Sequence, residues 1–362
     1  MIEILRKMFR HYFSDPQVIM LGFLLIFGFV LVFAFGKMLM PVFISIIIAY
    51  LLEGMVAGLE RFGAPRIIAV VIVFTIFMAC LLLLILWLLP LLSRQIGQLL
   101  HDLPSMVAST QKVLMQLPEK YPELISKSQI QQINDYLTTE LTRLGQYLLS
   151  ASLASVRGLI TFLVYLILVP LMVFFFLKDK TTIIAWVRSF LPEERKLADE
   201  VWDEVNQQIG NYVRGKMWEI LIVWVVTYAT FILLKVPFTM LLSLFVGLSV
   251  LVPYIGATIM FFPVGLIAFF EWGWGAEFAY TMIALGIIQA LDGNLLVPLL
   301  LSGVVNIHPI AIIVAVLLFG GLWGLWGLFF AIPLATLFHA VSKVWLESSI
   351  REKQPNDASQ AI

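Results

Sequence analysis

Three polar side chains lie close together in the middle of an apolar run near the C-terminal end of the chain. Gln289, Asp292 and Asn294 all fall within the run 278–301. A carboxylate inside a membrane segment is costly, so Asp292 marks a candidate functional site. Its side chain could carry a proton when neutral or hold a monovalent cation when ionised. The alternative is that Asp292 ends a short helix in an Asp-Gly-Asn turn, and Pro298 predicts a break in either case.

A second polar group stands just before an apolar run that begins near residue 220. Its members are Asn206, Gln207, Asn211 and Tyr212. They form either a gate or polar pathway, or the solvated face of an amphipathic helix. Histidine changes charge near neutral pH, so His308, beside Pro309, could serve such a pathway. A single histidine at a helix start can equally cap that helix.

The composition excludes an ordinary soluble protein. Of the 362 residues, 61% are hydrophobic and 13% are charged, whereas soluble domains are about half apolar and about a quarter charged. The formal net charge is zero, so nothing indicates a nucleic-acid partner. The sequence has no phosphate-binding loop, HExxH pair or GxSxG elbow, and its histidines and single Cys80 lack metal-ligand spacing. We therefore expect an integral membrane protein that is not an enzyme and has no cofactor or metal.

Apolar runs of membrane-crossing length predict an all-α polytopic protein with a small helical extramembrane domain. A spanning helix needs about 20 apolar residues, and about eight membrane segments are expected. Six have an ordinary length: 18–35, 38–52, 67–92, 153–177, 220–234 and 278–301. The other two, 240–270 and 309–341, are too long for one crossing and too short for two.

Both long runs are interrupted near their middle, first by Val252-Pro253-Tyr254-Ile255-Gly256 and then by Phe319-Gly320-Gly321. Proline removes a backbone donor and glycine loosens a helix, and freed backbone groups in a bilayer need protein or water partners. Pro253, Tyr254, Gly256, Gly320 and Gly321 are therefore candidate substrate- or ion-binding positions in re-entrant or broken hairpins. The alternative is a pair of long, tilted, kinked spans.

The distribution of lysine and arginine places both termini in the cytoplasm. Eight full spans put the loop 271–277 inside, whereas six spans and two hairpins put it outside. An apolar stripe from Leu197 to Ile209 predicts a helix that lies along the membrane surface. The expected segments are the first three membrane helices (1–92), a helical extracytoplasmic domain (93–150), the fourth membrane helix (151–177), a cytoplasmic helical segment (178–216), a C-terminal membrane transport region (217–342) and a cytoplasmic tail (343–362).

Several strings together have a recognisable pattern. They are Leu177-Lys178-Asp179, Val252 through Gly256, Asp292 through Pro298, His308-Pro309 and Phe319 through Ala335. This set resembles the autoinducer-2 exporter (AI-2E) family over nearly the whole chain. Phe13 through Pro16 and Asn206 through Ile209 are similar to a permease group within that family. The resemblance implies a carrier of the bacterial inner membrane that forms a homo-oligomer, with a pentamer as one form. Members of the family are linked to export of the autoinducer-2 signal, or to sodium or lithium extrusion against protons.

The residues and the resemblance together predict a secondary transporter that works by alternating access. Its cargo would be a small polar solute, such as a signalling molecule, or a monovalent cation, and its partners would be lipid and other copies of the chain. Asp292 would exchange the coupling ion, H⁺ or Na⁺, and the broken helices would form the moving part of the site. A non-transporting scaffold that recruits partners and a passive channel are the alternatives.

Overall fold

The structure of the chain is a computed structural model. It describes residues 16–120, 155–189, 196–253, 255–301, 308–324 and 330–338, together with 132, 139, 143, 327 and 328. Every regular element in this part of the chain is a helix, which confirms the all-α prediction. The predicted tail 343–362 lies outside the described residues, and so does the part of the predicted domain 93–150 after residue 120, except for 132, 139 and 143.

The chain forms two compact units. Unit 1 comprises residues 1–75, 168–217 and 299–362, and unit 2 comprises residues 76–167 and 218–298. Some long helices contain residues of both units, so a unit boundary can fall within a helix. Each unit is described by itself below.

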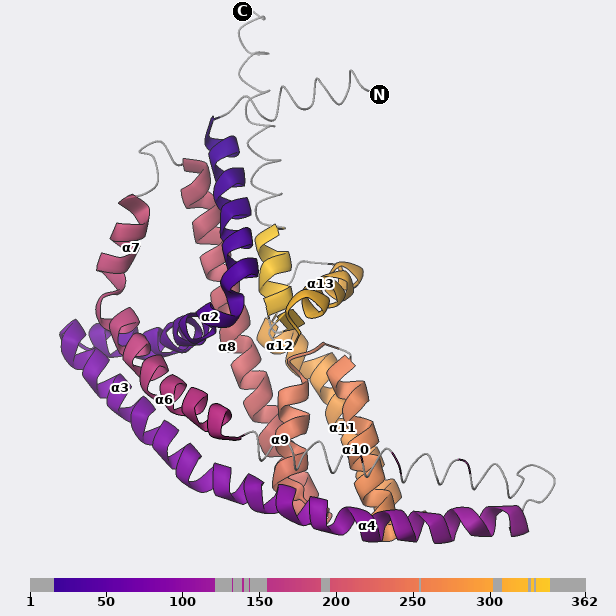
Figure 1. The fold of residues 1–362 in the computed structure, drawn as a ribbon. Helices are drawn as coiled ribbons and strands as arrows, with labels where there is room; N and C mark the ends of the chain where they lie inside the picture. The colour runs from indigo at the N-terminus through magenta and orange to yellow at the C-terminus, as the bar shows by residue number, and fades with distance from the viewer. Residues whose placement is uncertain are drawn as a thin grey trace, which may run out of the picture. The chain divides into compact units, whose positions relative to one another are not determined.

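Helix α2 (Pro16–Arg61) is one helix of 46 residues, although the sequence predicted two spans over the same range. Gly36 and Lys37, the expected loop, stay helical because neither residue alone breaks hydrogen bonding between turns. Pro41 lies inside the helix and leaves the carbonyl of Lys37 without its usual donor. The helix changes direction along its length (Figure 1), as proline-containing helices do.

Helical structure continues without a break from Arg66 to Lys120. α3 (Arg66–Leu83) leads through a π-helical turn, η1 (Leu84–Leu88), into α4 (Leu89–Lys120). Pro90 follows η1 by two residues. Since proline cannot donate to the carbonyl four residues earlier, a wider turn before it keeps the helix continuous. The candidate membrane span in this helix is Arg66–Met106.

The next three helices are α6 (Ser155–Lys178), α7 (Lys180–Ser189) and α8 (Lys196–Leu233). The stripe from Leu197 to Ile209 belongs to α8, the same uninterrupted helix that contains the candidate span Asn206–Leu233. The prediction that this stripe lies along the membrane surface was therefore wrong. No proline or glycine-rich turn separates the polar from the apolar part, so one helix continues through both.

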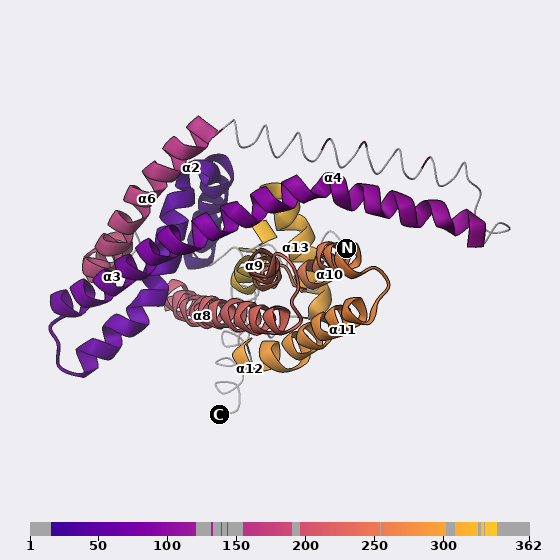
Figure 2. The same ribbon diagram turned by 90° about the horizontal axis from the view of Figure 1, so that it is seen from below.

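The first long apolar run folds into a hairpin of two helices in unit 2, α9 (Thr239–Ser249) and α10 (Ile255–Trp272). A Cβ atom at Gly256 would overlap the carbonyl oxygen of Ser249, so the chain turns back on itself within seven residues. Figure 2 shows α9, α10 and α11 (Ala276–Leu291) side by side. Their facing side chains form the core of unit 2 with α8: Val223, Phe231, Val236, Leu242, Val246, Val250, Met260, Val264, Ile267, Leu285 and Ile288.

The second long run is also a hairpin, in unit 1. α13 (Pro309–Trp323) ends at Gly324, whose φ of 62° suits glycine, and the chain is helical again at 327–328 and 330–338. A Cβ atom at Gly327 would overlap the carbonyl oxygen of Phe319, so the two halves meet closely. Both runs are thus broken, as one of the two alternatives predicted.

Six helices in the described part of the chain are long and apolar enough to cross a membrane. They confirm a polytopic membrane protein, while the expected number of about eight segments stays a prediction. The two shorter apolar helices, Thr239–Ser249 and Ile310–Trp323, belong to the two hairpins. A helix of 11 residues, such as α9, is about 16 Å long and does not cross the hydrocarbon by itself.

Candidate functional site

Asp292 lies in the apolar core of unit 2. Only 7% of the surface of Asp292 is exposed. Leu285 and Ile288 precede it by seven and four residues, so the three share one helical face, and both leucine and isoleucine belong to the core. Leu296, four residues later, packs against the same core. Asp292 therefore lies on the helical face that packs into the apolar core. There an ionised carboxylate needs a cation or several hydrogen bonds, and otherwise the carboxyl group is stable in its protonated form.

The backbone around Asp292 is a π-helical turn, η2 (Asp292–Leu296), which joins α11 to α12 (Val297–Leu301). The amide of Val297 donates to the carbonyl oxygen of Asp292, five residues earlier. Pro298 thus does not break the helix, contrary to our prediction. Proline has no backbone N–H to donate, and the wider π turn before it keeps the helix continuous without that hydrogen bond. The alternative in which Asp292 ends a helix in an Asp-Gly-Asn turn is excluded by the same geometry. Single π turns inside α-helices occur frequently at functional sites.

The polar neighbours of Asp292 have different roles. Asn294 is exposed, and its Nδ2 donates a 2.8 Å hydrogen bond to the carbonyl oxygen of Ala290, so it supports the helix locally. Gln289 has both side-chain amide atoms buried without a hydrogen-bond partner. Such groups are rare in folded proteins and have hydrogen-bonding capacity that a ligand or an ion can use.

A further polar group of the same core was not singled out in the sequence. Thr227 of α8 is 0% exposed, and its Oγ1 has no hydrogen-bond partner. Val223 and Phe231, four residues before and after it, belong to the core of unit 2. The hydroxyl group therefore faces the apolar cluster that Asp292 also faces. A threonine within an apolar run is too common a pattern to have indicated this.

The hairpin residues serve mainly to bring helices together. Gly256 is required by its close approach to Ser249, beside Pro253 in the turn of the α9–α10 hairpin. Tyr254 lies outside the described residues. In unit 1, a Cβ atom at Gly320 would collide with the side chain of Leu328, whereas one at Gly321 would meet nothing within 4 Å. Gly320 and Gly321 belong to unit 1 and Asp292 to unit 2, so the predicted positions are divided between the units.

The polar segment before the fifth span packs against α2 through Tyr50. The hydroxyl of Tyr50 donates a 2.9 Å hydrogen bond to the carbonyl oxygen of Asn206, and its ring occupies the space beside Gly210. Arg214 lies 5.8 Å from the centre of the same ring. Its Nη2 also donates to Oδ1 of Asn211 at 2.9 Å.

The remaining residues of the predicted gate lie in different surroundings. Tyr212 is 1% exposed, whereas Gln207 is exposed. His308 is the N-cap of α13, because its Nδ1 accepts a 3.3 Å hydrogen bond from the amide of Ile310. The capping alternative thus describes the contact that His308 makes.

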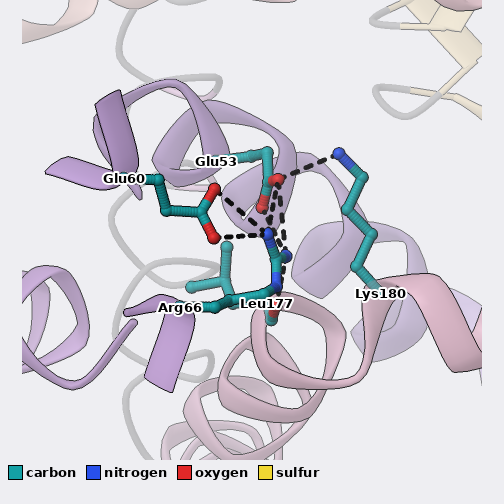
Figure 3. Close-up of polar contacts among 5 residues, drawn as sticks. All are labelled: Glu53, Glu60, Arg66, Leu177 and Lys180. Atoms are coloured by element: carbon teal, nitrogen blue, oxygen red, sulfur yellow. Dashed lines mark hydrogen bonds and ion pairs between the residues drawn. The ribbon is translucent and has the colours of Figure 1, made fainter. Parts of the chain in front are cut away.

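Charged side chains from three helices and a carbonyl from a fourth meet in unit 1 and form a cluster that we call the ionic clamp: Glu53, Glu60, Arg66, Lys180 and the carbonyl group of Leu177 (Figure 3). Arg66 Nη2 lies 3.3 Å from Glu53 Oε2, and Arg66 Nη1 lies 3.2 Å from Glu60 Oε1. Lys180 Nζ lies 2.9 Å from Glu53 Oε1. Two cations balance two carboxylates, which lowers the cost of gathering them at the helix ends.

The sequence of the whole chain identifies its relatives. The sequence profile described as AI-2E family transporter matches residues 20–347. The chain belongs to the AI-2E family. The resemblance expected from the motifs is therefore confirmed over nearly the full length.

Proteins similar to this AI-2E chain are known from several bacteria. It is 44% identical over 353 residues to "Putative permease PerM" of Escherichia coli K12, covering 98% of this chain and 100% of that protein. It is 25% identical to "Putative transport protein YueF" of Bacillus subtilis, covering 86% and 84% of the two chains. It is 28% identical to "Putative transport protein sll0063" of Synechocystis, covering 81% and 74%. The family relationship supports a multi-pass membrane protein of the transporter kind.

Sequence reasoning missed several charged residues of this AI-2E chain. Glu53 and Glu60 lie seven residues apart, on one face of α2, and that spacing was the signal available for the clamp. Lys216 and Glu219 lie one turn apart on α8 and are 3% and 1% exposed. The sequence pattern that could have indicated Lys216 and Glu219 is a pair of opposite charges at the start of an apolar run. No group of histidine, cysteine and acidic residues suited to a metal ion occurs within the described ranges.

Proposed function

We propose that this AI-2E family member is an ion-coupled secondary transporter. It moves a small polar solute, such as a signalling molecule, or a monovalent cation by alternating access. The observation that carries the proposal is the burial of Asp292 in a π-helical turn within the apolar core of unit 2. An ionised carboxyl group is costly at a buried position of a membrane segment, so Asp292 is the residue we expect to exchange a proton or a monovalent cation.

Two features of unit 2 support an exchange of this kind. Gln289 precedes Asp292 by three residues, and its buried amide group has unused hydrogen-bonding capacity. The hydroxyl of Thr227 faces the same core with the same property. Oxygen atoms from a carboxylate, an amide and a hydroxyl are ligands that bind alkali and other hard cations, and they also hold water for proton transfer.

The two hairpins support alternating access. Discontinuous membrane helices build the binding sites of secondary transporters, because their free ends and turns can move without breaking a complete span. The turn of the α9–α10 hairpin carries Pro253, and the α13 hairpin turns at Gly324. By family resemblance, the working form is a homo-oligomer in the bacterial inner membrane. The distribution of lysine and arginine favours both termini in the cytoplasm.

A flux measurement in proteoliposomes tests the proposal. The purified chain is screened with sodium, lithium and a set of small polar solutes, with and without a proton or sodium gradient. The wild-type protein is expected to show saturable flux that follows the gradient. Asp292→Asn keeps the shape of the side chain and removes its charge, so gradient-driven flux should be lost while the protein remains assembled.

The control is another carboxylate of the same continuous helix. Glu277 is exposed in the first turn of α11, and Glu277→Gln should leave flux unchanged. Equal flux and equal ion dependence in Asp292→Asn and the wild type would contradict the assignment of Asp292. Flux that does not saturate and does not respond to any gradient would instead indicate a passive channel.

A further inference from the structure

Helix α7 has an apolar face that is half-buried at Ile183 and Ile184 and exposed at Trp186 and Val187. None of its residues from Lys180 to Ser189 is buried. At about 3.6 residues per turn, the apolar side chains fall on one side of the helix: Ile183, Ile184, Trp186 and Val187. Trp186 is 63% exposed and Val187 is 47% exposed. Ala185 and Ser189 lie on the opposite side.

The start of α7 lies where membrane helices end. Three candidate spans end or begin at the ionic clamp: Met38–Arg61, Arg66–Met106 and Thr161–Lys178. The side chains of Glu53, Arg66 and Lys180 in the clamp are 19%, 29% and 43% exposed. Charged groups of this kind stay out of hydrocarbon. The clamp therefore marks the level at which α2, α3 and α6 leave the hydrocarbon, and α7 begins at that level.

Two contacts fix the first turn of α7 at this boundary. Lys180, its first residue, forms the 2.9 Å ion pair with Glu53 of α2. The joint with α6 is a single residue, Asp179, whose amide donates to Phe175 at 2.8 Å and whose carbonyl accepts from Ile183 at 2.9 Å. A joint this short, held by an ion pair, does not let α7 move far from the membrane surface.

The charges of α7 fit an anionic lipid surface. The segment from Lys180 to Ser189 contains no acidic residue. Arg188 in its last turn and Lys178 just before it are exposed. Basic residues beside an exposed apolar face with a tryptophan are typical of helices that bind the headgroup region, where basic groups meet anionic lipids.

We propose that α7 lies in the headgroup region of the bilayer, with Trp186 and Val187 inserted toward the lipid chains and Arg188 beside anionic headgroups. The ionic clamp holds the start of the helix at that depth. The partner of this surface is lipid, and the inference does not depend on which cargo the protein transports.

Site-directed spin labelling of the full chain tests the proposal. Cys80, which is exposed, is first replaced by Ser. Single cysteines are then placed at Val187, on the apolar face, and at Ala185, on the opposite face, as a matched control. In vesicles of phosphatidylcholine with phosphatidylglycerol, the label at Val187 should meet dissolved oxygen several-fold more often than a water-soluble nickel complex. The label at Ala185 should show the opposite preference.

Three results would overturn the proposal. Equal exposure of both labels to the nickel complex would show that α7 is in water. Spin–spin broadening at Val187 that disappears on dilution with unlabelled protein would show that a second copy covers the face. An unchanged depth in vesicles of phosphatidylcholine alone would exclude the anionic headgroup.

A second measurement tests the proposal without the cysteine variants, in case these do not fold. Brominated lipid should quench the tryptophan fluorescence of the wild-type protein more than that of Trp186→Phe, because Trp186 contributes the lipid-accessible emission of α7. Equal quenching in the two proteins would contradict insertion of α7.

Discussion

Arg66 donates a 2.7 Å hydrogen bond to the carbonyl oxygen of Leu177, a residue 111 positions later in the chain. The carbonyl groups in the last turn of a helix have no partner within that helix. Arg66 provides one for α6 while its guanidinium also pairs with Glu53 and Glu60. One side chain at the start of α3 thus joins the end of α2 to the end of α6.

Removal of Arg66 should lower the stability of unit 1. Arg66→Gln leaves Glu60 without its cation and Glu53 with Lys180 alone. Because the pairs are partly exposed, we expect a loss of about 1–3 kcal/mol, seen as a lower midpoint of thermal unfolding in detergent. The double variant Arg66→Gln with Glu53→Gln should lose less than the sum of the two single variants.

Arg61 is the matched control for this experiment. It is exposed in the last turn of α2, five residues from Arg66. Arg61→Gln should change the midpoint of unfolding little. If the two arginine variants unfold at the same temperature, the clamp does not stabilise the fold.

Lys235 should be replaceable by glycine with a gain in stability. It has a φ of 55°, in the left-handed region, at the end of α8. The amide of Val236 donates to the carbonyl oxygen of Phe231 at 2.9 Å, which is the pattern of a helix end that glycine favours. Lys235→Gly should stabilise the protein by about 1 kcal/mol, whereas Lys235→Val should destabilise it. The midpoints of thermal unfolding show whether each variant is more or less stable than the wild type. A higher midpoint for Lys235→Val than for Lys235→Gly would refute the backbone argument.

Gly256 should not tolerate even one added methyl group. A Cβ atom there would overlap the carbonyl oxygen of Ser249, so Gly256→Ala must open the α9–α10 hairpin. We expect a loss of about 3 kcal/mol or more, or failure to assemble. Gly286 of α11 is the control, because a Cβ atom there meets nothing within 4 Å and alanine favours a helix. Similar yield and thermal stability for the two variants would show that the hairpin turn is not tightly packed.

The loop between α10 and α11 should face the outside of the cell. The turn of the α9–α10 hairpin brings Ser249 close to Gly256. The two ends of a re-entrant hairpin lie on the same side of the membrane, and a chain of six spans and two such hairpins has this loop outside. A cysteine at Ala276, in a chain without Cys80, should react with a membrane-impermeant maleimide in right-side-out vesicles. Reaction only in inside-out vesicles would favour eight full spans.

Sequence reasoning identified some local interruptions of helices correctly and others wrongly. Pro253 and the glycines around Gly324 predicted interrupted apolar runs, and the structure shows a hairpin at each. It failed at Pro298 because a missing donor can be accommodated in more than one way, and the π turn at Asp292 preserves the helix. It failed at Gly36 and Lys37 for a related reason, since a residue that weakens a helix need not end it.

By itself, the sequence determined that this protein spans a membrane, that proline and glycine interrupt two apolar runs and that Asp292 is an unusual carboxylate. Those properties depend on composition and on the backbone chemistry of single residues. Only the tertiary structure decided which side chains meet. Glu53 and Lys180 are 127 positions apart, and they form an ion pair because α2 and the joint between α6 and α7 pack at one level. Such a contact depends on how helices assemble, which local patterns do not encode.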